Sequence, residues 1–317
     1  MQSRYYLGID GGQSSTIALI ADETGQVLGR GKSGPCNHVS AAEGRARFFS
    51  AVSGCLQAAC DQAGLHWTDL QFASVCLGFS GGAEDKDQYT RDLIRSTRYK
   101  ITHDAEIALA GAIPDEAGLI AIAGTGSMIF GRNHQGETAR AGGWGYIYGD
   151  EGGAFDLTRR ALRAALAYEE GWGPATDLHH MLLETSGAES ANRILHNFYG
   201  SVSRPMIASY APLVTRAALD GDTVAQTILQ EAAAGLSRYV RGAYNRLFPA
   251  RESVPVCYIG AVFRSGPLLH SFKKQIEKAI QCPVGPPRFS PAVGALLEAL
   301  RADGNNHTPS RLPEEEK

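Results

Sequence analysis

The chain has 317 residues, of which 44% are hydrophobic and 20% charged, and its formal net charge is −3 at pH 7. This length predicts two domains, each large enough to bury its own core, and the composition is that of an ordinary soluble globular protein. The negative charge argues against non-specific nucleic-acid binding and against attachment to an anionic membrane surface. No apolar run reaches the roughly 20 residues of a transmembrane helix. We therefore expect neither a nucleic-acid partner nor a membrane association.

Six cysteines occur in the chain, and none has the CxxC spacing of a metal or redox site. No secretory leader is recognisable before Tyr5. These observations predict reduced thiols and a cytoplasmic protein. The cysteines are Cys36, Cys55, Cys60, Cys76, Cys257 and Cys282.

The first part of the chain begins with three predicted strands and then alternates helices with strands. The order β-β-β-α-β-α-β is typical of a ribonuclease-H-like unit, in which helices cover a mixed sheet. The predicted strands are Tyr5–Asp10, Thr16–Ala21, Gln26–Gly31, Phe72–Phe79 and Tyr99–Thr102, and the predicted helices are Ala41–Ala63, Lys86–Ser96 and Ala105–Ala112.

The same order then begins again. Residues 175–250 interrupt it with an almost wholly helical pattern, which we interpret as a helical insertion. The tail at 303–317 is too polar to pack and is predicted to be disordered. The predicted strands are Leu119–Ala123, Met128–Arg132, Thr138–Gly142 and Val256–Gly260, and the predicted helices are Ala154–Tyr168, Gly266–Ala279 and Ala292–Ala302.

Two glycine turns of the same kind occur, one in each half of the chain. The first contains Asp10, Gly11, Gly12 and Ser14, and the second reads Gly124-Thr125-Gly126-Ser127. Glycine lets a turn bring peptide N–H groups close to a phosphate, and a carboxylate at the end of a strand can hold Mg²⁺. The alternatives are an Asp that caps its turn and an ordinary hairpin turn. Because both turns follow an apolar strand, we interpret them as two halves of a nucleotide site.

Asp104 follows a short predicted strand and begins a helix. It is either a structural N-cap or a base that takes the proton of a sugar hydroxyl during phosphoryl transfer. The run from Gly142 to Gly153 is rich in glycine and contains Trp144, Asp150 and Glu151. Such loops can place an aromatic face and hydrogen-bond acceptors on a polyol, although a glycine-rich structural corner is the alternative.

The pair Asn37-His38 follows the first three strands. A loop amide there suits a sugar hydroxyl or an acetamido group, and a solvated turn is an equally good interpretation.

These motifs resemble those of the sugar kinase/Hsp70/actin superfamily. The Asp10 turn, the Gly124 turn and the run Cys257–Val262 resemble its two phosphate motifs and its adenosine motif. The segments His103–Leu109 and Pro291–Leu300 resemble its two connecting helices. Over residues 4–302 the chain resembles the BadF/BadG/BcrA/BcrD-type ATPase family and, within it, kinases that act on N-acetylglucosamine and N-acetylmuramic acid.

The resemblance implies an α/β fold of two ribonuclease-H-like, actin-like ATPase domains with a cleft between them. Residues 1–112 and the helix at 291–302 would form the first domain. Residues 113–290 would form the second domain, which carries the helical insertion.

The resemblance also implies an ATP-dependent kinase that uses Mg²⁺ and phosphorylates the 6-hydroxyl of an amino sugar. Asp104 would be the base and Asp10 would organise the metal. The nucleotide would contact Asp10, Gly11, Gly12, Ser14, Gly124, Thr125, Gly126, Ala218, Gly260 and Ser265. The sugar would contact Asn37, His38, Ser80, Gly81, Asp104, Ser127, Gly143, Trp144, Gly145 and Asp150.

The choice of sugar stays open, with glucosamine as an alternative acceptor. Val39 and Met128 depart from the animal N-acetylglucosamine kinases on the sugar side of the motifs. An ATPase activator of a radical dehydratase is a second alternative. That branch needs paired cysteines for an iron–sulfur cluster, and no cysteine occurs between Cys76 and Cys257. The helical insertion suggests a homodimer.

Overall fold

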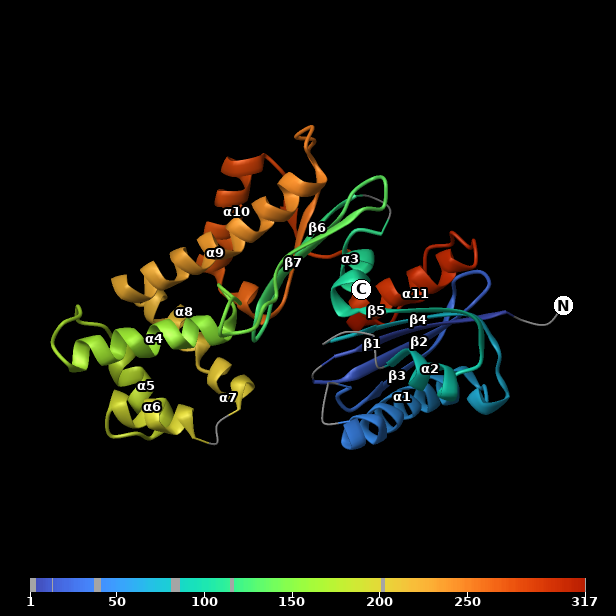
Figure 1. The fold of residues 1–317 in the computed structure, drawn as a ribbon, viewed down its shortest axis with the longest axis horizontal. Helices are drawn as coiled ribbons and strands as arrows, with labels where there is room; N and C mark the ends of the chain where they lie inside the picture. The colour runs from blue at the N-terminus through green and yellow to red at the C-terminus, as the bar shows by residue number, and fades with distance from the viewer. Residues whose placement is uncertain are drawn as a thin grey trace. The chain divides into compact units, whose positions relative to one another are not determined.

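Each half of the chain builds a five-stranded mixed sheet, and the two sheets share one strand order (Figure 1). The computed structural model describes residues 4–12, 14–36, 41–80, 86–114, 117–200 and 203–316. The chain divides into unit 1, which comprises Met1–Glu116 and Pro287–Lys317, and unit 2, which comprises Ala117–Pro286.

The strand order is β3-β2-β1-β4-β5 in unit 1 and β8-β7-β6-β9-β10 in unit 2. In both sheets the central strand pairs antiparallel with the strand that follows it and parallel with the fourth strand of its unit. This match confirms the prediction of two ribonuclease-H-like units. The strands are β1 Tyr5–Gly11, β2 Thr16–Asp22, β3 Val27–Ser33, β4 Phe72–Phe79, β5 Ser96–His103, β6 Gly118–Ala123, β7 Ser127–Arg132, β8 Thr138–Gly142, β9 Val256–Ile259 and β10 Val284–Gly285.

Helices cover both faces of the sheet of unit 1. Figure 1 shows α1 on one face and α3 with α11 on the other. The contact of α11 with β1 is close because a Cβ atom on Gly8 would overlap the backbone of Leu296. The helices of this unit are α1 Ala41–Ala63, α2 Lys86–Leu93, α3 Asp104–Ala112 and α11 Pro291–Ala302, with short 3₁₀ turns at Trp67–Asp69 and Glu314–Glu316.

Two boundaries in unit 1 reflect specific local contacts. The helix predicted to reach Ser96 ends at Leu93, because Ser96 already pairs with Phe72 of the neighbouring strand. Helix α11 begins where Ser290 accepts a hydrogen bond from Val293 N and Pro291 occupies the first turn. An N-cap serine followed by proline is a common helix start.

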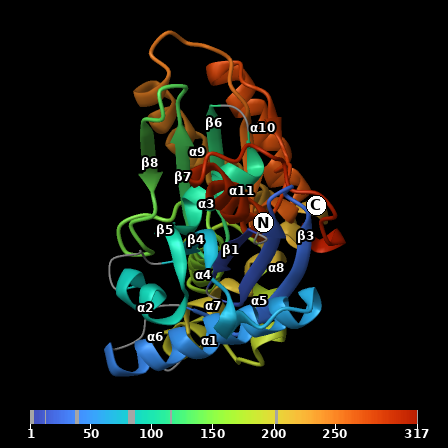
Figure 2. The same ribbon diagram turned by 90° about the vertical axis from the view of Figure 1, so that its right-hand side faces the viewer.

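Unit 2 carries most of the helices. Figure 2 shows α9 and α10 side by side, and α9 also packs on β7. The 25-residue helix α9 begins at Asp222, whose Oδ1 accepts a hydrogen bond from Ala225 N at 2.9 Å. The helices are α4 Ala154–Glu169, α5 Leu178–Ser186, α6 Ala191–Tyr199, α7 Arg204–Ala208, α8 Ala211–Leu219, α9 Thr223–Leu247 and α10 Gly266–Ile280, with a 3₁₀ turn η2 at Ala261–Arg264.

The C-terminal tail differs from the expectation of disorder, since residues 303–316 pack on unit 1. Asp303 pairs with Arg4 and Arg98 and accepts a hydrogen bond from Tyr6 Oη at 2.7 Å. Glu316 is only 1% exposed and pairs with Arg30 Nε at 2.7 Å. The polar composition of the tail gave no indication of this packing, because the residues that pair with it lie far away in sequence.

All six cysteines are free and buried. Within the described ranges, no helix combines the length and the apolar character needed to cross a membrane.

Candidate active site

Three strands of unit 1 end at one edge of the sheet and bring together residues that are distant in sequence. The parallel register aligns Gly11 with Phe79 and Phe79 with His103. The residues that follow these strand ends therefore lie side by side. Ser80 N donates a hydrogen bond to Gly11 O at 3.1 Å, which joins the Asp10 turn to the end of β4. Ligands of open α/β sheets commonly bind at the carboxyl ends of strands.

Asp104 is the first residue of α3 and accepts a hydrogen bond from Ser80 Oγ at Oδ2, at 2.6 Å. Its side chain therefore lies at a helix N-terminus, where the helix dipole attracts negative charge. Two residues further on, Glu106 lies 2.7 Å from Lys100 Nζ, which also contacts Glu298 at 2.6 Å. This cluster ties α3 to β5 and α11 and so holds the carboxylate of Asp104 in place.

Asp10 is half-buried near the end of β1 and lies close to other carboxylates. Burial, together with the negative charges of Asp104 and Glu316, raises the pKa of Asp10 to about 7. A carboxylate with such a pKa releases its proton readily when a cation binds beside it.

Some backbone groups of the first glycine turn are already hydrogen-bonded within the protein. Gly12 N donates to Ser15 O at 3.0 Å, and Gly12 O accepts from Cys36 N at 3.1 Å. The N–H group of Gly12 is therefore engaged inside the turn, while the side chain of Ser14 is exposed. The predicted site residues Asn37, His38 and Gly81 lie outside the described residues.

In unit 2 the second glycine turn supports the start of α4. Ala154 N donates to Gly124 O at 2.8 Å, and Phe155 N donates to Thr125 O at 3.0 Å. The turn carbonyls thus satisfy N–H groups that a helix N-terminus would otherwise leave open. Gly126 has no room for a side chain, because a Cβ atom there would overlap the carboxylate of Asp150.

Asp150 connects the second turn with the tryptophan loop. It is 8% exposed and adopts a positive φ of 64°, which is uncommon for residues other than glycine. Burial raises the pKa of Asp150, against hydrogen bonds from the backbone of Ser127 and Gly145 and the positive charge of Arg204. The side chain therefore holds both loops in place. Backbone strain of this kind is frequently found at functional sites.

The remaining predicted sugar residues lie around Asp150. Ser127 Oγ donates to Glu151 O at 2.7 Å, and Gly143 N donates to Ser127 O at 2.9 Å. Trp144 is 66% exposed, and the guanidinium of Arg140 lies 4.6 Å from its ring centroid. An exposed aromatic face at a glycine-rich loop suits stacking on a sugar ring.

A pocket of about 500 Å³ lies between α4, α8 and η2 in unit 2. Ser265 lines it, and Thr215 Oγ1 donates to Ser265 Oγ at 2.9 Å. Gly260 stands close to the second glycine turn, since a Cβ atom there would overlap the carbonyl of Ala123. The pocket size suits a nucleoside. Ala218, which the resemblance assigned to the adenosine pocket, is buried in the core of unit 2.

Sequence reasoning missed the side chains of α8 and η2 that line this pocket. No local signal marks them, because α8 and η2 are more than 40 residues apart in the chain. They are Ala211, Pro212, Thr215, Arg216, Leu219 and Arg264, whereas Ala261 and Val262 belong to the run Cys257–Val262 that the sequence had already indicated.

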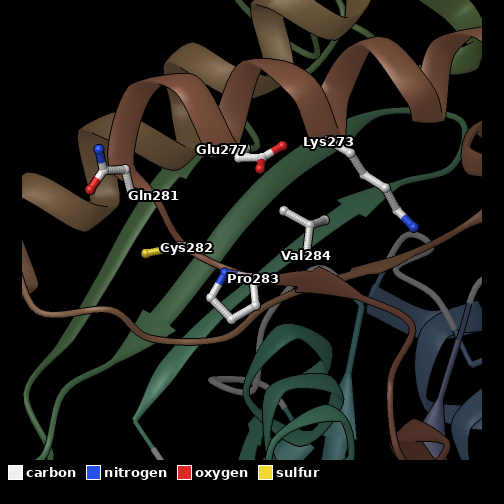
Figure 3. Close-up of a pocket in the computed structure, with 6 residues that line it drawn as sticks. All are labelled: Lys273, Glu277, Gln281, Cys282, Pro283 and Val284. Atoms are coloured by element: carbon white, nitrogen blue, oxygen red, sulfur yellow. The ribbon is translucent and has the colours of Figure 1, made fainter.

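A second hollow of about 700 Å³ lies beside β10. Figure 3 shows Lys273 and Glu277 on α10, with Pro283 and Val284 on the segment that enters β10. Val284 pairs with Val256 at the start of β9. The second glycine turn follows β6 at the opposite end of this sheet, so the hollow lies apart from the site.

Comparisons with known proteins identify the family of this chain. A model of the BadF/BadG/BcrA/BcrD ATPase family matches residues 7–299. An N-acetylmuramic acid/N-acetylglucosamine kinase of Clostridium acetobutylicum is 33% identical over 268 residues, which cover 83% of this chain and 86% of that protein. An N-acetyl-D-glucosamine kinase of Dictyostelium discoideum is 29% identical and covers 95% of this chain and 99% of its own length. A solved structure of a candidate N-acetylglucosamine kinase from Chromobacterium violaceum superposes with a TM-score of 0.75 at 26% identity, over 93% of this chain and 98% of that one.

Proposed function

Because the chain belongs to the BadF/BadG/BcrA/BcrD ATPase family, we propose that it is an ATP-dependent kinase acting on the 6-hydroxyl of an amino sugar. N-acetylglucosamine and N-acetylmuramic acid are the acceptors we favour, because the relatives named above carry those substrates in their names. The observation that carries the proposal is the carboxylate of Asp104, which Ser80 orients at 2.6 Å beside the Asp10 turn.

In this reaction Asp104 orients the 6-hydroxyl and takes its proton. A bond forms between the sugar oxygen and the γ-phosphorus while the bond from that phosphorus to the oxygen of ADP breaks. The carboxylate contributes chiefly by positioning the nucleophile, because such a transition state needs little covalent help.

The two glycine turns hold the phosphates in this proposal. Ser14 and Thr125 supply hydroxyl groups, and the pocket beside Ser265 takes the adenosine. Asp150 acts on the acceptor side by keeping the Gly143–Gly145 loop in one conformation for the sugar.

Asp10 fits a Mg²⁺ site. Its carboxylate is a hard oxygen ligand. Burial and the neighbouring negative charges raise its pKa to about 7, and a bound cation would offset both effects. Within the described ranges, no group of three or more His, Cys, Asp or Glu residues could hold a metal. Mg²⁺ is usually held by one or two carboxylates together with substrate phosphates. Bound Mg²⁺ would neutralise charge on the transferred phosphate.

We further propose a cytoplasmic homodimer. The six free thiols support a reducing compartment. Exposed apolar side chains on the helical part of unit 2, among them Trp172 at 69% and Met206 at 56%, support a partner surface there. Light scattering of the purified protein tests the dimer, and a monomer at micromolar concentration would contradict it.

A coupled ADP-release assay over neutral hexoses, glucosamine, N-acetylglucosamine and N-acetylmuramic acid tests the activity. We expect turnover with N-acetylated amino sugars and a product whose phosphate NMR assigns to the 6-oxygen. Turnover with glucosamine alone would identify a glucosamine kinase, and no ADP release with any sugar would overturn the proposal.

A further inference from the structure

A pocket of about 600 Å³ in unit 2 combines three arginines with apolar walls. It lies among α4, α6, α7 and the loop after Gly145, and α4 packs on both other helices (Figure 1). We call it the arginine pocket. Its defining residues are Arg159, Arg163, Arg204, Tyr146, Phe155 and Phe198.

The charges of this pocket are unbalanced. Among the described residues that line it, none is acidic. Arg159 pairs with Asp156 at 2.6 Å, but that buried carboxylate also holds Arg160 at 2.9 Å. In the described part of the chain, Arg163 and Arg204 have no carboxylate within ion-pairing distance. The pocket therefore offers at least two guanidinium groups that no carboxylate of the described residues pairs with directly.

The position of Arg204 is defined by an aromatic ring. Its guanidinium lies 5.3 Å from the centroid of Tyr146, and that ring packs on Phe155 with centroids 4.9 Å apart. An arginine stacked on an aromatic face keeps its planar edge available for a carboxylate.

The arginine pocket adjoins the loop that carries the proposed sugar residues. Tyr146 directly follows Gly145, whose N–H group hydrogen bonds to Asp150. The charge of Arg204 acts on the same Asp150 carboxylate. Arg159 Nη1 donates to Tyr146 O at 3.4 Å, so the loop after Gly145 contacts both the arginine pocket and the proposed sugar site.

We propose that the arginine pocket is a subsite for a carboxylate-bearing substituent of the acceptor, so that acidic N-acetylated amino sugars are preferred over neutral ones. This inference rests on the proposed kinase function. Arginine binds a carboxylate through two parallel hydrogen bonds, and the aromatic and aliphatic walls suit the alkyl part of such a substituent. The absence of acidic lining side chains in the described residues would disfavour a cationic group such as a free amine.

The test compares three acceptors that differ in this one group. They are N-acetylmuramic acid, its uncharged methyl ester and N-acetylglucosamine. The kcat/KM values are measured for the wild type, Arg163→Gln and Arg204→Gln, and for Arg193→Gln as a control, since Arg193 is exposed on α6 and does not line the pocket. Melting temperatures and the KM for ATP are recorded for each variant.

We expect the ratio of kcat/KM for the acid to that for the ester to fall about tenfold or more in Arg204→Gln and in Arg163→Gln. The ratio should stay at the wild-type value in Arg193→Gln. The preference for the acid should also weaken at high salt.

Three outcomes overturn the inference while leaving the kinase function intact. The first is a wild type that phosphorylates the neutral sugar but gains nothing from the carboxylate. The second is an acid-to-ester ratio of kcat/KM that is unchanged in both pocket variants. The third is a rise in the KM for ATP without a change in that ratio, which would make the arginines nucleotide ligands. A wild type that phosphorylates none of the three sugars would instead contradict the proposed function itself.

Discussion

Asp104 is the residue on which the proposed chemistry depends most directly. Asp104→Asn keeps an oxygen that accepts the hydrogen bond of Ser80 Oγ but removes the proton acceptor. We expect kcat to fall by about 10²- to 10⁴-fold with little change in melting temperature. ADP release at saturating sugar measures the effect. Ser80→Ala, which affects only positioning, should cost less, and full turnover by Asp104→Asn would remove the carboxylate from the mechanism.

Asp10 makes stability depend on pH. Its pKa is raised from the ordinary value of 3.8 to about 7, so between these values the unfolded chain releases a proton that the folded chain keeps. Folded stability therefore decreases as the pH rises through this window and levels off above pH 7. At 1.36 kcal/mol per pH unit, the upper limit of this penalty is about 4 kcal/mol.

Asp10→Asn removes the penalty along with the activity. Without Mg²⁺, we expect its melting temperature to exceed that of the wild type at pH 8 and to approach it near pH 4. Thermal unfolding across this range is the measurement, with Glu184→Gln, an exposed carboxylate, as the control. An equal difference at every pH would contradict the raised pKa. Added Mg²⁺ should stabilise only the protein that retains Asp10.

At the scale of elements, the end of β9 is tied to the end of β6 through Gly260. This residue has a φ of 117°, and a Cβ atom on it would overlap the carbonyl of Ala123. Gly260→Ala must therefore displace the strand end that precedes the second glycine turn. We expect a loss of about 1–3 kcal/mol in unfolding free energy and a higher KM for ATP.

Gly136→Ala is the control for Gly260→Ala, because it introduces the backbone strain of a positive φ without displacing a neighbouring strand. Gly136 has a φ of 82° in the turn between β7 and β8, and no atom lies within 4 Å of a Cβ built there. This variant should lose only about 1 kcal/mol and leave the KM for ATP unchanged. Denaturant unfolding and ATP titration of both variants make the comparison. Equal KM values for ATP in Gly260→Ala and Gly136→Ala would show that Gly260 does not contribute to nucleotide binding.

Elements with a strong local signal were predicted well. All eight residues of β4, Phe72–Phe79, are buried, and its bounds agree with the predicted strand. Helix α1 also has the predicted bounds, Ala41–Ala63. Strand β10 was missed because two residues carry no periodicity. It forms a strand only by pairing with β9, which lies 28 residues earlier in the chain.

At the scale of the whole molecule, the C-terminal tail contributes to unit 1. Glu316 pairs with Arg30 and accepts a hydrogen bond from Ser290 at the start of α11. Removing one member of a buried ion pair costs about 3–5 kcal/mol, because the partner stays buried without its counter-charge.

We therefore expect Glu316→Gln, or a chain that ends at Asp303, to lower the melting temperature of unit 1 by about 5 °C or more. Glu315→Gln is the matched control, since Glu315 is exposed. Scanning calorimetry resolves the transition. A chain shortened at Asp303 that melts like the full chain would show that the tail contributes nothing.

The sequence by itself determined the repeated strand order, both glycine turns and the carboxylates Asp10 and Asp104. These features depend on near neighbours in the chain, through hydrophobic periodicity and the conformational freedom of glycine. For Asp150 the sequence indicated a functional loop but not that its carboxylate lies against Gly126.

Only the tertiary structure decided which distant side chains meet. It placed Ser80 on Asp104, Thr215 on Ser265 and Arg204 on Tyr146. It also packed the polar tail on unit 1 through Glu316. Such contacts depend on where separate elements pack on a sheet. The local sequence patterns that specify each element do not specify that arrangement.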